Sequence, residues 1–424
     1  MIVKHNVSIP KKWFNLIPVL KEPLPPLQDV VDEKGSRVEL MKRIRLKQLL
    51  VQDSSNDPYI PIPDKIQELY SNIGRPTPLY RALNLERYLD TPAHIYVKRE
   101  DVLPTGSFKI NTAIPQAYYG MKENVEGLVS ETGAGQWGVS LAYACSLMNI
   151  KSKIFWVKIS SIQKPYRVSF AKLLGADVVP SPSRETLVGR QLLEEIPNCN
   201  GSIGISIGEA ISFASEHPNY KYVSGSNLTH ILVHQSIIGL ETKAQLSQLG
   251  VNADILVACV GGGSNLGGFM FPFITANRKD MPELIGVESS SIPRLSKGIY
   301  KYDHSDPFGL TPKTKSYTLG IDFIPPPIHV GGLRQHNGSP IIASLKNEGI
   351  LNIKAYSQEE IFEAGKIFIK CEHFIPAPET NHAIKAAIDI ALECKKKKEK
   401  KNIVLCFSGN GLLDLSGYKH ILKL

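Results

Sequence analysis

Short apolar runs alternate with longer amphipathic segments along the chain from residue 94 onward. The runs are continuous rather than alternating, which is typical of strands buried on both faces of a parallel sheet. They predict strands at residues 93–98, 127–130, 152–159, 254–260, 283–287 and 402–407. Apolar residues at helical spacing predict helices at residues 139–150, 169–175, 242–250 and 382–394. This order predicts an α/β fold of two three-layer domains with mostly parallel sheets.

Residues 1–74 have a different pattern. Proline clusters at residues 22–29 and 59–65 flank one charged, helix-like stretch at residues 36–50. We expect this segment to be an extension that packs against the body of the protein or against a partner.

Composition and charge exclude several classes of function. The chain has 424 residues and a net charge of +9. Part of that excess is the basic run at residues 395–401, which precedes an apolar strand and contains no aromatic residue. The run is therefore predicted to be a solvated helix end, and no nucleic-acid partner is expected.

The cysteines and the amino terminus indicate a protein of the cytoplasm. The six cysteines are widely scattered and form no CxxC pair, which argues against a zinc site or a disulfide framework. The amino terminus has no apolar core of the kind found in signal peptides, and no apolar run is long enough to span a bilayer. We expect a cytoplasmic protein without a membrane partner.

Glycine-rich loops follow several of the predicted strands, at the ends where open α/β sheets bind ligands. In residues 255–270, ILVACVGGGSNLGGFM, three glycines follow a buried strand and precede a helix. Consecutive glycines allow backbone N–H groups to converge on an anion. The loop has no P-loop lysine, and Leu266 occupies the place of the third glycine of a dinucleotide fingerprint. A phosphate on a ligand smaller than a dinucleotide fits best.

Two further loops have the same strand-to-turn pattern. ETGAGQWG at residues 131–138 offers backbone amides for a carboxylate, with Glu131 at its mouth as an acid–base candidate. FSGNG at residues 407–411 places the Ser408 hydroxyl at the end of a strand. Taken singly, both signals are weak.

A lysine completes the set. Lys109 lies in VLPTGSFKINTA, residues 102–113, after a turn and before a predicted helix, with Phe108 and Ile110 as neighbours. A lysine among apolar groups loses its proton more readily and becomes a nucleophile toward an aldehyde. A lysine, a phosphate loop and a neutral hydroxyl together match pyridoxal phosphate. A serine facing the ring nitrogen would leave that nitrogen unprotonated and favour β-elimination and β-replacement over transamination.

Six segments together resemble a known family. PTGSFKINTA, ETGAGQWG, VGGGSN, LGIDF, IPAPETNHAI and FSGNG, in this order, resemble the β subunit of tryptophan synthase, a fold-type-II pyridoxal phosphate enzyme. Trp137 and the proline-rich extension resemble the second β-subunit group of that family. The resemblance implies that the cofactor lies at a domain interface. Residues 75–108 and 230–424 would form the cofactor-phosphate domain, and residues 109–229 a second domain with a mobile, substrate-gating part.

The resemblance also implies roles for single residues. Lys109 would bind the cofactor covalently and take the α-proton of serine, and Glu131 would protonate the leaving hydroxyl and then orient indole. Asp322, in LGIDF, would belong to the closing segment. The cofactor would be bound by the phosphate loop and by two residues near the ring: Gly261, Gly262, Gly263, Ser264, Asn265, Glu379 and Ser408. The substrate carboxylate would be bound by Thr132, Gly133, Ala134, Gly135, Gln136 and Trp137.

The implied reaction is L-serine plus indole giving L-tryptophan and water. The resemblance further implies a homodimer and a monovalent cation site that the sequence does not locate. Two positions depart from the common pattern, because Phe108 and Trp137 stand where histidines are usual. The extension covers a region that the common β subunit uses around its α partner, so we expect weak or no contact with an α subunit.

Other functions stay open on the sequence alone. A serine or threonine dehydratase, or a β-replacement enzyme using phosphoserine or a sulfur nucleophile, would need the same cofactor residues; Glu131 favours indole chemistry. A non-catalytic binding subunit finds support only in Phe108 and the basic run. A nicotinamide-dependent oxidoreductase is disfavoured by Leu266 in the glycine loop.

Overall fold

A seven-stranded sheet forms one side of the molecule in the computed structural model, which describes residues 3–4, 7–33, 35–275, 277 and 280–424. Its outer pairs β1–β6 and β6–β7 are antiparallel, and its other pairs are parallel. In spatial order the strands are β1 (Val3–Lys4), β6 (Leu79–Arg81), β7 (His94–Arg99), β17 (Asn402–Phe407), β12 (Ile255–Cys259), β13 (Glu283–Ser289) and β16 (Leu351–Tyr356).

Helices cover both faces of this sheet because its strands are apolar on both faces. Val257, Ile285 and Leu405 pack on one side, and Leu256, Leu284 and Val404 on the other. The first side is covered by α4 (Leu83–Leu89), α16 (Gln358–Glu372), α17 (Pro378–Lys397) and α18 (Leu415–Leu422). The second is covered by α11 (Thr229–Gln235), α12 (Ile237–Gln248), α13 (Ser264–Met270) and α15 (Pro340–Asn347).

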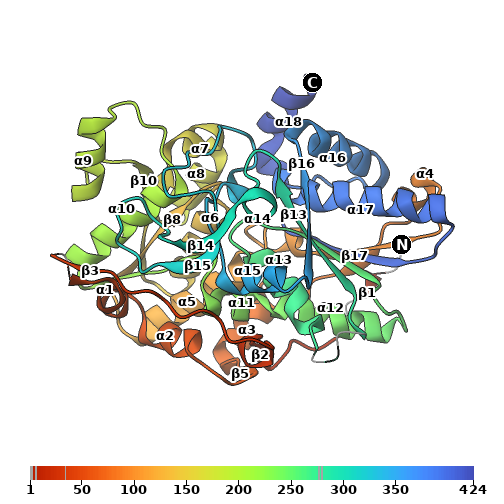
Figure 1. Ribbon diagram of the computed structural model, residues 1–424, viewed down its shortest axis with the longest axis horizontal. Helices are drawn as coiled ribbons and strands as arrows, with labels where there is room; N and C mark the ends of the chain where they lie inside the picture. The colour runs from red at the N-terminus through yellow and green to blue at the C-terminus, as the bar shows by residue number, and fades with distance from the viewer. Residues whose placement is uncertain (1–2, 5–6, 34, 276, 278–279) are drawn as a thin grey trace.

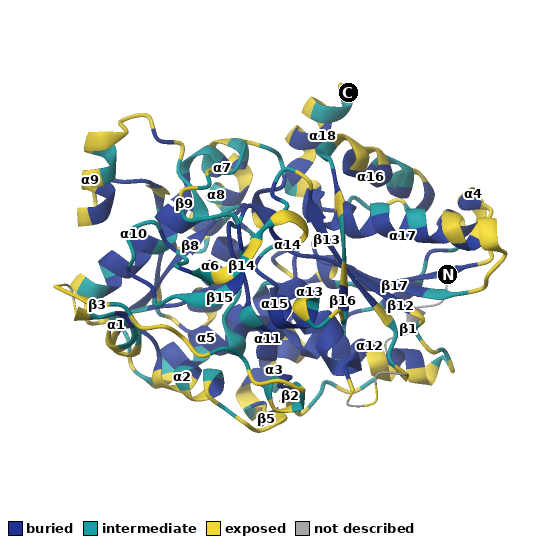
Figure 2. Cartoon of the chain, viewed as in Figure 1, coloured by how far each residue is buried: buried dark blue, intermediate teal, exposed yellow. Residues whose placement is uncertain are grey.

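A smaller, fully parallel sheet lies on the other side of the molecule (Figure 1). Its order is β10 (Asp177–Ser181), β9 (Lys151–Val157), β8 (Gly127–Thr132) and β11 (Tyr220–Tyr222). It also has helices on both faces: α9 (Leu187–Glu195) and α10 (Ile203–Glu216) on one, α6 (Gln136–Leu147) and α8 (Pro165–Leu173) on the other, with α7 (Lys158–Gln163) beside α8. Figure 2 shows the central strands β17 and β12 of the large sheet as part of the buried interior, whereas the edge strand β16 is partly exposed. The prediction of an α/β fold with mostly parallel sheets is confirmed.

The extension packs onto the body. Strand β2 (Lys12–Phe14) pairs with β5 (Tyr59–Pro61), and Trp13 is fully buried with its ring 4.5 Å from the ring of His234 in α11. The Phe14 amide donates to Ser236 Oγ at 2.7 Å. The extension also contributes α1 (Arg37–Ile44), α2 (Lys47–Asp53), α3 (Asp64–Asn72) and a small hairpin of β3 (Val31–Asp32) and β4 (Gly35–Ser36).

The single helix-like stretch predicted at residues 36–50 is wrong in one respect, because two helices form there. Arg45 and Leu46 have extended backbones between α1 and α2. Leu46 is thereby buried, and Arg45 pairs with Asp53. Tertiary contacts at the joint therefore outweigh local helix propensity.

The six strands and four helices predicted from the pattern are confirmed within a few residues. Strands β10, β11 and β16 were missed, because they lie at sheet edges, where polar residues interrupt the apolar run. The basic run forms the exposed end of α17 and leads into β17, as predicted.

The remaining elements connect the sheets. Helix α5 (Ile110–Lys122) links the large sheet to the small one, and α14 (Arg294–Lys297) precedes a hairpin of β14 (Ile299–Asp303) and β15 (Thr314–Thr318). Among the described helices, none combines the length and the apolar character needed to cross a membrane.

Candidate active site

One cavity lies where β8, β12 and β17 end. Its walls include residues within two positions of the ends of these strands: Gly133, Gly261 and Ser408. It therefore opens at the carboxyl ends of strands from both sheets, which is where α/β folds bind ligands. The structure brings all the predicted site residues except Asp322 to this cavity.

Lys109 directly precedes α5, and it lines the cavity. Its Nζ donates to Ser264 Oγ at 2.9 Å and to the Gly225 carbonyl oxygen. Burial lowers the pKa of this amine to about 8, against the opposing influence of the Glu131 charge. About a tenth to a fifth of Lys109 is then neutral near physiological pH, far more than of an ordinary lysine, and the neutral amine is the nucleophile.

The three glycines of the phosphate loop could not carry side chains without displacing their neighbours. A Cβ on Gly261 would lie 2.4 Å from the Gly332 carbonyl oxygen, and one on Gly262 would lie 2.0 Å from Ser226 Oγ. Gly263 has φ +122°, a conformation that favours glycine. The turn is therefore a backbone cradle beside Lys109, and it suits a phosphate group.

Glu131 is the last residue but one of β8 and is buried in the cavity wall. Its Oε2 accepts a hydrogen bond from the Tyr222 hydroxyl and its Oε1 one from Ser224 Oγ, both at 2.9 Å. Burial raises its pKa to about 7, although these hydrogen bonds oppose the rise. A carboxyl with this pKa can both give and take a proton at neutral pH.

Trp137 contributes to the wall in an unexpected way. Its indole Nε1 donates to Ser130 Oγ at 2.7 Å, and its ring lies so close to Gly225 that a Cβ there would be 2.2 Å from the ring. The Trp137 side chain is thus fixed behind the loop by its own polar contact. Gly135 has φ +93° and lies directly against the ring of Trp156, so the loop backbone has a tightly defined course.

A third part of the wall comes from the carboxyl-terminal half of the chain. Ser408 Oγ lies 2.8 Å from Thr380 Oγ1, and Glu379 Oε1 accepts from the Gly332 amide at 2.8 Å. Within the described part of the chain, the other buried Glu379 oxygen, Oε2, has no hydrogen-bond partner. This orphaned acceptor, the glycine cradle and the lysine fit a phosphorylated, ring-containing cofactor that forms a bond to an amine.

Asp322 is exposed on a loop and is not part of the cavity wall. Arg167, which lies in α8, pairs with the buried Asp414 and donates to the Ala134 carbonyl oxygen at 3.2 Å. His382 is fully buried in α17 with its Nδ1 3.1 Å from the Pro378 carbonyl oxygen, so it packs inside the helix region.

Sequence reasoning missed part of the wall. Gly225 and Ser226 follow β11, and Gly331, Gly332 and Gln335 follow the segment of Asp322. The motifs VSGSN at residues 223–227 and VGGLRQ at residues 330–335 could have been recognised, since both contain glycines like the three loops that were predicted. Tyr222 and Ser224 had no signal, because only the pairing of β11 with β8 brings them to Glu131.

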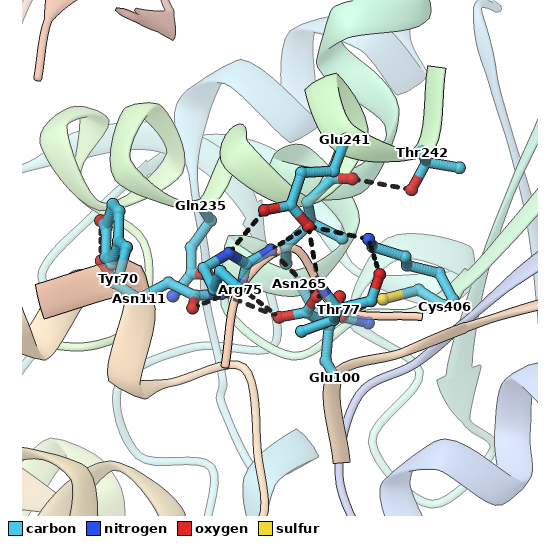
Figure 3. A network of polar contacts seen from close by, with 12 residues as sticks. Tyr70, Arg75, Thr77, Glu100, Asn111, Gln235, Glu241, Thr242, Asn265 and Cys406 are labelled. Atoms are coloured by element: carbon cyan, nitrogen blue, oxygen red, sulfur yellow. Dashed lines mark hydrogen bonds and ion pairs between the residues drawn. The ribbon is translucent and has the colours of Figure 1, made fainter. Parts of the chain in front are cut away.

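A buried charged cluster supports the start of α5 (Figure 3). Arg75 pairs with Glu100 and Glu241, each at 2.9 Å, and Lys98 pairs with Glu241 at 2.8 Å. Arg75 and Glu100 both bond the side chain of Asn111, two residues after Lys109. All four charged side chains are fully buried. The cluster therefore fixes the first turn of the helix that follows the lysine.

Comparison with known proteins agrees with this geometry. The two helix-covered sheets, the buried lysine and the glycine cradle define a pyridoxal-phosphate-dependent enzyme, and the family model described as "Pyridoxal-phosphate dependent enzyme" matches residues 70–409. Within that class, the chain belongs to the tryptophan synthase β-chain family.

Its curated relatives match over almost their full length. Tryptophan synthase β chain 2 of Methanothermobacter thermautotrophicus is 50% identical over 424 residues, covering 100% of this chain and 98% of the relative. β chain 1 of Sulfurisphaera tokodaii is 50% identical over 97% of each chain. β chain 2 of Pyrococcus furiosus is 47% identical, covering 100% of this chain and 95% of the relative.

Solved structures of more distant proteins share the fold. Threonine deaminase isoform 2 from Solanum lycopersicum superposes with a TM-score of 0.62 at 19% identity, covering 96% of this chain and 100% of that one. A fungal L-serine ammonia-lyase from Rhizomucor miehei gives 0.60 at 17% identity, covering 82% of this chain and 97% of that one. At this identity the likeness concerns the fold alone.

Proposed function

We propose that the protein catalyses a pyridoxal-phosphate-dependent β-replacement in which L-serine and indole give L-tryptophan and water. The observation that carries this proposal is that the Glu131 carboxyl and the Lys109 amine share one cavity, with pKa values near 7 and 8. Two groups that exchange protons near neutral pH match a reaction that removes an α-proton, expels a hydroxyl and adds indole. The relatives named tryptophan synthase β chain support the choice of substrates.

Pyridoxal phosphate, when bound, supplies an aldehyde for covalent attachment and an electron sink for negative charge at the α-carbon. Lys109 Nζ would be the attachment point and afterwards the base for the α-proton of serine. The cofactor phosphate would be held by the loop residues Gly261, Gly262, Gly263, Ser264 and Asn265. Ser408 would face the ring nitrogen and Glu379 the ring oxygen, where its Oε2 is free to accept a hydrogen bond.

The substrate would lie between Lys109 and Glu131. Residues Thr132 to Trp137 offer backbone amides to its carboxylate, and Glu131 gives a proton to the departing hydroxyl, which leaves as water. The same carboxylate then accepts a hydrogen bond from the indole N–H and so orients the indole ring. Asp322, exposed outside the cavity, belongs in this scheme to a segment that closes over the bound substrate.

The first test is tryptophan formation by the purified, cofactor-loaded protein given L-serine and indole. We expect tryptophan from the parent and none from Lys109→Ala, whereas a matched change of an exposed lysine, Lys47→Ala, should leave the rate unchanged. Pyruvate from serine alone, with no tryptophan, would instead indicate a dehydratase. Replacing serine by phosphoserine or indole by a thiol in the same assay ranks the other β-replacement reactions.

The assembly and the domains are part of the same proposal. We expect a cytoplasmic homodimer with weak or no α-subunit contact and a monovalent cation site built from backbone carbonyl groups. Within the described residues, no group of three histidine, cysteine or acidic side chains is arranged to hold a metal ion. The cofactor-phosphate domain would comprise residues 75–108 and 230–424, and residues 109–229 would include the gating part. Light scattering after gel filtration, with and without an α subunit, tests the assembly.

A further inference from the structure

Two hydroxyl groups hold the Glu131 carboxyl from a strand that sequence reasoning left out of the site. Tyr222 ends β11, which pairs in parallel with β8, and its hydroxyl donates to Glu131 Oε2 at 2.9 Å. Ser224, two residues further on, donates to Oε1 at 2.9 Å. Tyr222 and Ser224 are almost completely buried, and neither is among the residues that line the cavity. They therefore approach the carboxyl from the protein side.

A second arm reaches the same group. Trp137 Nε1 donates to Ser130 Oγ at 2.7 Å, and Ser130 Oγ in turn donates to the Val223 carbonyl oxygen at 2.5 Å and lies 3.4 Å from Glu131 Oε2. The backbone between Tyr222 and Ser224 is thereby tied to β8. The carboxyl and its two hydroxyl donors are held as one unit.

These contacts restrict the positions that a proton on Glu131 can take. Each carboxyl oxygen has two lone pairs, and one on each oxygen already accepts a hydrogen bond from the scaffold. The Tyr222 hydroxyl stays a donor, because burial raises its pKa well above the usual range and the charge of Glu131 adds to this effect. A proton on Glu131 therefore occupies one of the remaining lone pairs, on the side of the carboxyl that borders the cavity.

We propose that Tyr222 is a positioning residue which, together with Ser224, orients the Glu131 carboxyl so that its exchangeable proton faces the substrate. The inference rests on the proposed function, since it assigns Glu131 the proton transfers of that reaction. It explains why this carboxyl has donors on both oxygens and still serves as an acid.

Few charged groups face Glu131 from the elements packed around it. Lys109 approaches from the start of α5, and the Glu131 charge opposes the lowering of the Lys109 pKa by burial. Arg45, after α1, acts on Tyr222 rather than on the carboxyl. Glu209 of α10 is bonded to Ser183 and Thr186 instead. Next to burial, which raises the pKa of Glu131, and its own backbone amide, which lowers it, the Ser224 and Tyr222 hydroxyls are the strongest influences on the carboxyl, and both lower its pKa.

The test compares Tyr222→Phe with Tyr119→Phe in the cofactor-loaded protein. Both changes remove one hydroxyl from a buried tyrosine, but the Tyr119 hydroxyl bonds Gln52, away from the cavity. Because the Tyr222 hydrogen bond favours the ionised form, its loss should raise the pKa of Glu131 by about one unit. An infrared titration of the protonated carboxyl band measures that pKa, with Glu131→Gln to assign the band.

In the tryptophan assay, Tyr222→Phe should lower kcat about tenfold at pH 7, shift the pH profile upward and leave KM for serine nearly unchanged. Tyr119→Phe should match the parent in every readout. An unshifted infrared titration and pH profile in Tyr222→Phe would overturn the proposal. If that variant does not fold, Ser224→Ala takes its place, with the same expected direction.

The infrared readout separates this inference from the proposed function. A shifted Glu131 titration in a protein that makes no tryptophan would support the positioning role and reject the reaction. Normal tryptophan formation by the parent, with an unshifted Glu131 titration in Tyr222→Phe, would support the reaction and reject the positioning role.

Discussion

The side-chain nitrogen of Lys109 lies 2.9 Å from the hydroxyl oxygen of Ser264, although 155 positions separate the two residues in sequence. This contact joins the residue before α5 to the first residue of α13, directly after the glycine loop. It brings an amine with a lowered pKa beside a glycine cradle that suits a phosphate. The pairing of amine and cradle fits the pyridoxal-phosphate-dependent family to which the chain belongs.

The lowered pKa of Lys109 is directly measurable. In cofactor-free protein, we expect the amine to react with an acylating reagent with a midpoint near pH 8, because burial disfavours its charged form. Mass spectrometry of the labelled peptides, with exposed Lys47 as the internal comparison, measures this midpoint. Identical titration of the two lysines would show that the pocket does not perturb Lys109.

Removing the acid of Glu131 should abolish most turnover. We expect Glu131→Gln to slow tryptophan formation by about 10²–10⁴-fold, which is the usual contribution of a positioned acid or base. The pKa of Glu131 is raised to about 7, so the parent should show a pH limb near that value. The variant should lack the limb and still bind cofactor by its visible absorbance.

A suitable control for this prediction is Glu283→Gln. Glu283 is exposed at the start of β13, whereas the cavity lies at the carboxyl ends of the strands, and it bonds Asn352. Its loss should leave both the rate and the pH profile unchanged. A comparable loss of activity in both variants would contradict the role of Glu131.

The charged cluster beneath α5 should be essential for stability. Glu241→Gln leaves Arg75 and Lys98 with Glu100 as their only buried carboxylate, so one positive charge is uncompensated. We expect the free energy of unfolding to fall by about 3–5 kcal/mol. Urea denaturation measures this loss.

The control for the cluster is the exposed pair of Lys65 and Glu68. Glu68→Gln should cost less than about 1 kcal/mol, because water screens exposed pairs. Equal effects of Glu241→Gln and Glu68→Gln would mean that the buried cluster contributes no more than a surface pair.

The buried Asp414 should make stability depend on acid pH. Burial by itself raises the pKa of this carboxyl, but the charges of Arg167 and Lys164 outweigh that effect and hold it below the usual value. The stabilisation is therefore complete above the unfolded-state pKa of about 3.9 and is lost as the pH falls through the lower folded-state value. We expect Asp414→Asn to destabilise the protein by about 3–5 kcal/mol at pH 7.

The difference between parent and Asp414→Asn should shrink as the pH falls below about 4, because the parent carboxyl is then protonated too. Thermal unfolding across this pH range checks the sign. Asp389→Asn, which breaks a half-exposed pair with Lys385, should give a much smaller and less pH-dependent change. A difference that grows at acid pH would contradict the assigned charge state.

Much of this protein is determined by local sequence. Strands such as β12 and β17 are continuous apolar runs because both of their faces are buried. Such runs can be recognised in the sequence alone. The glycine loops and the turn before Lys109 carry their own backbone requirements, so most of the candidate site could be predicted. The phosphate cradle is the clearest case, since three consecutive glycines between an apolar strand and a helix can be recognised in the sequence alone.

Only the tertiary structure decided the rest, because it depends on contacts between distant segments. The pairing of β11 with β8 brings Tyr222 to Glu131, although neither residue signals the other in sequence. The break between α1 and α2 reflects the contacts of Arg45 and Leu46 rather than local propensity. Likewise, packing and neighbouring charges set the pKa of Lys109 and the pairing of Arg167 with Asp414, since both depend on which groups share a dry interior.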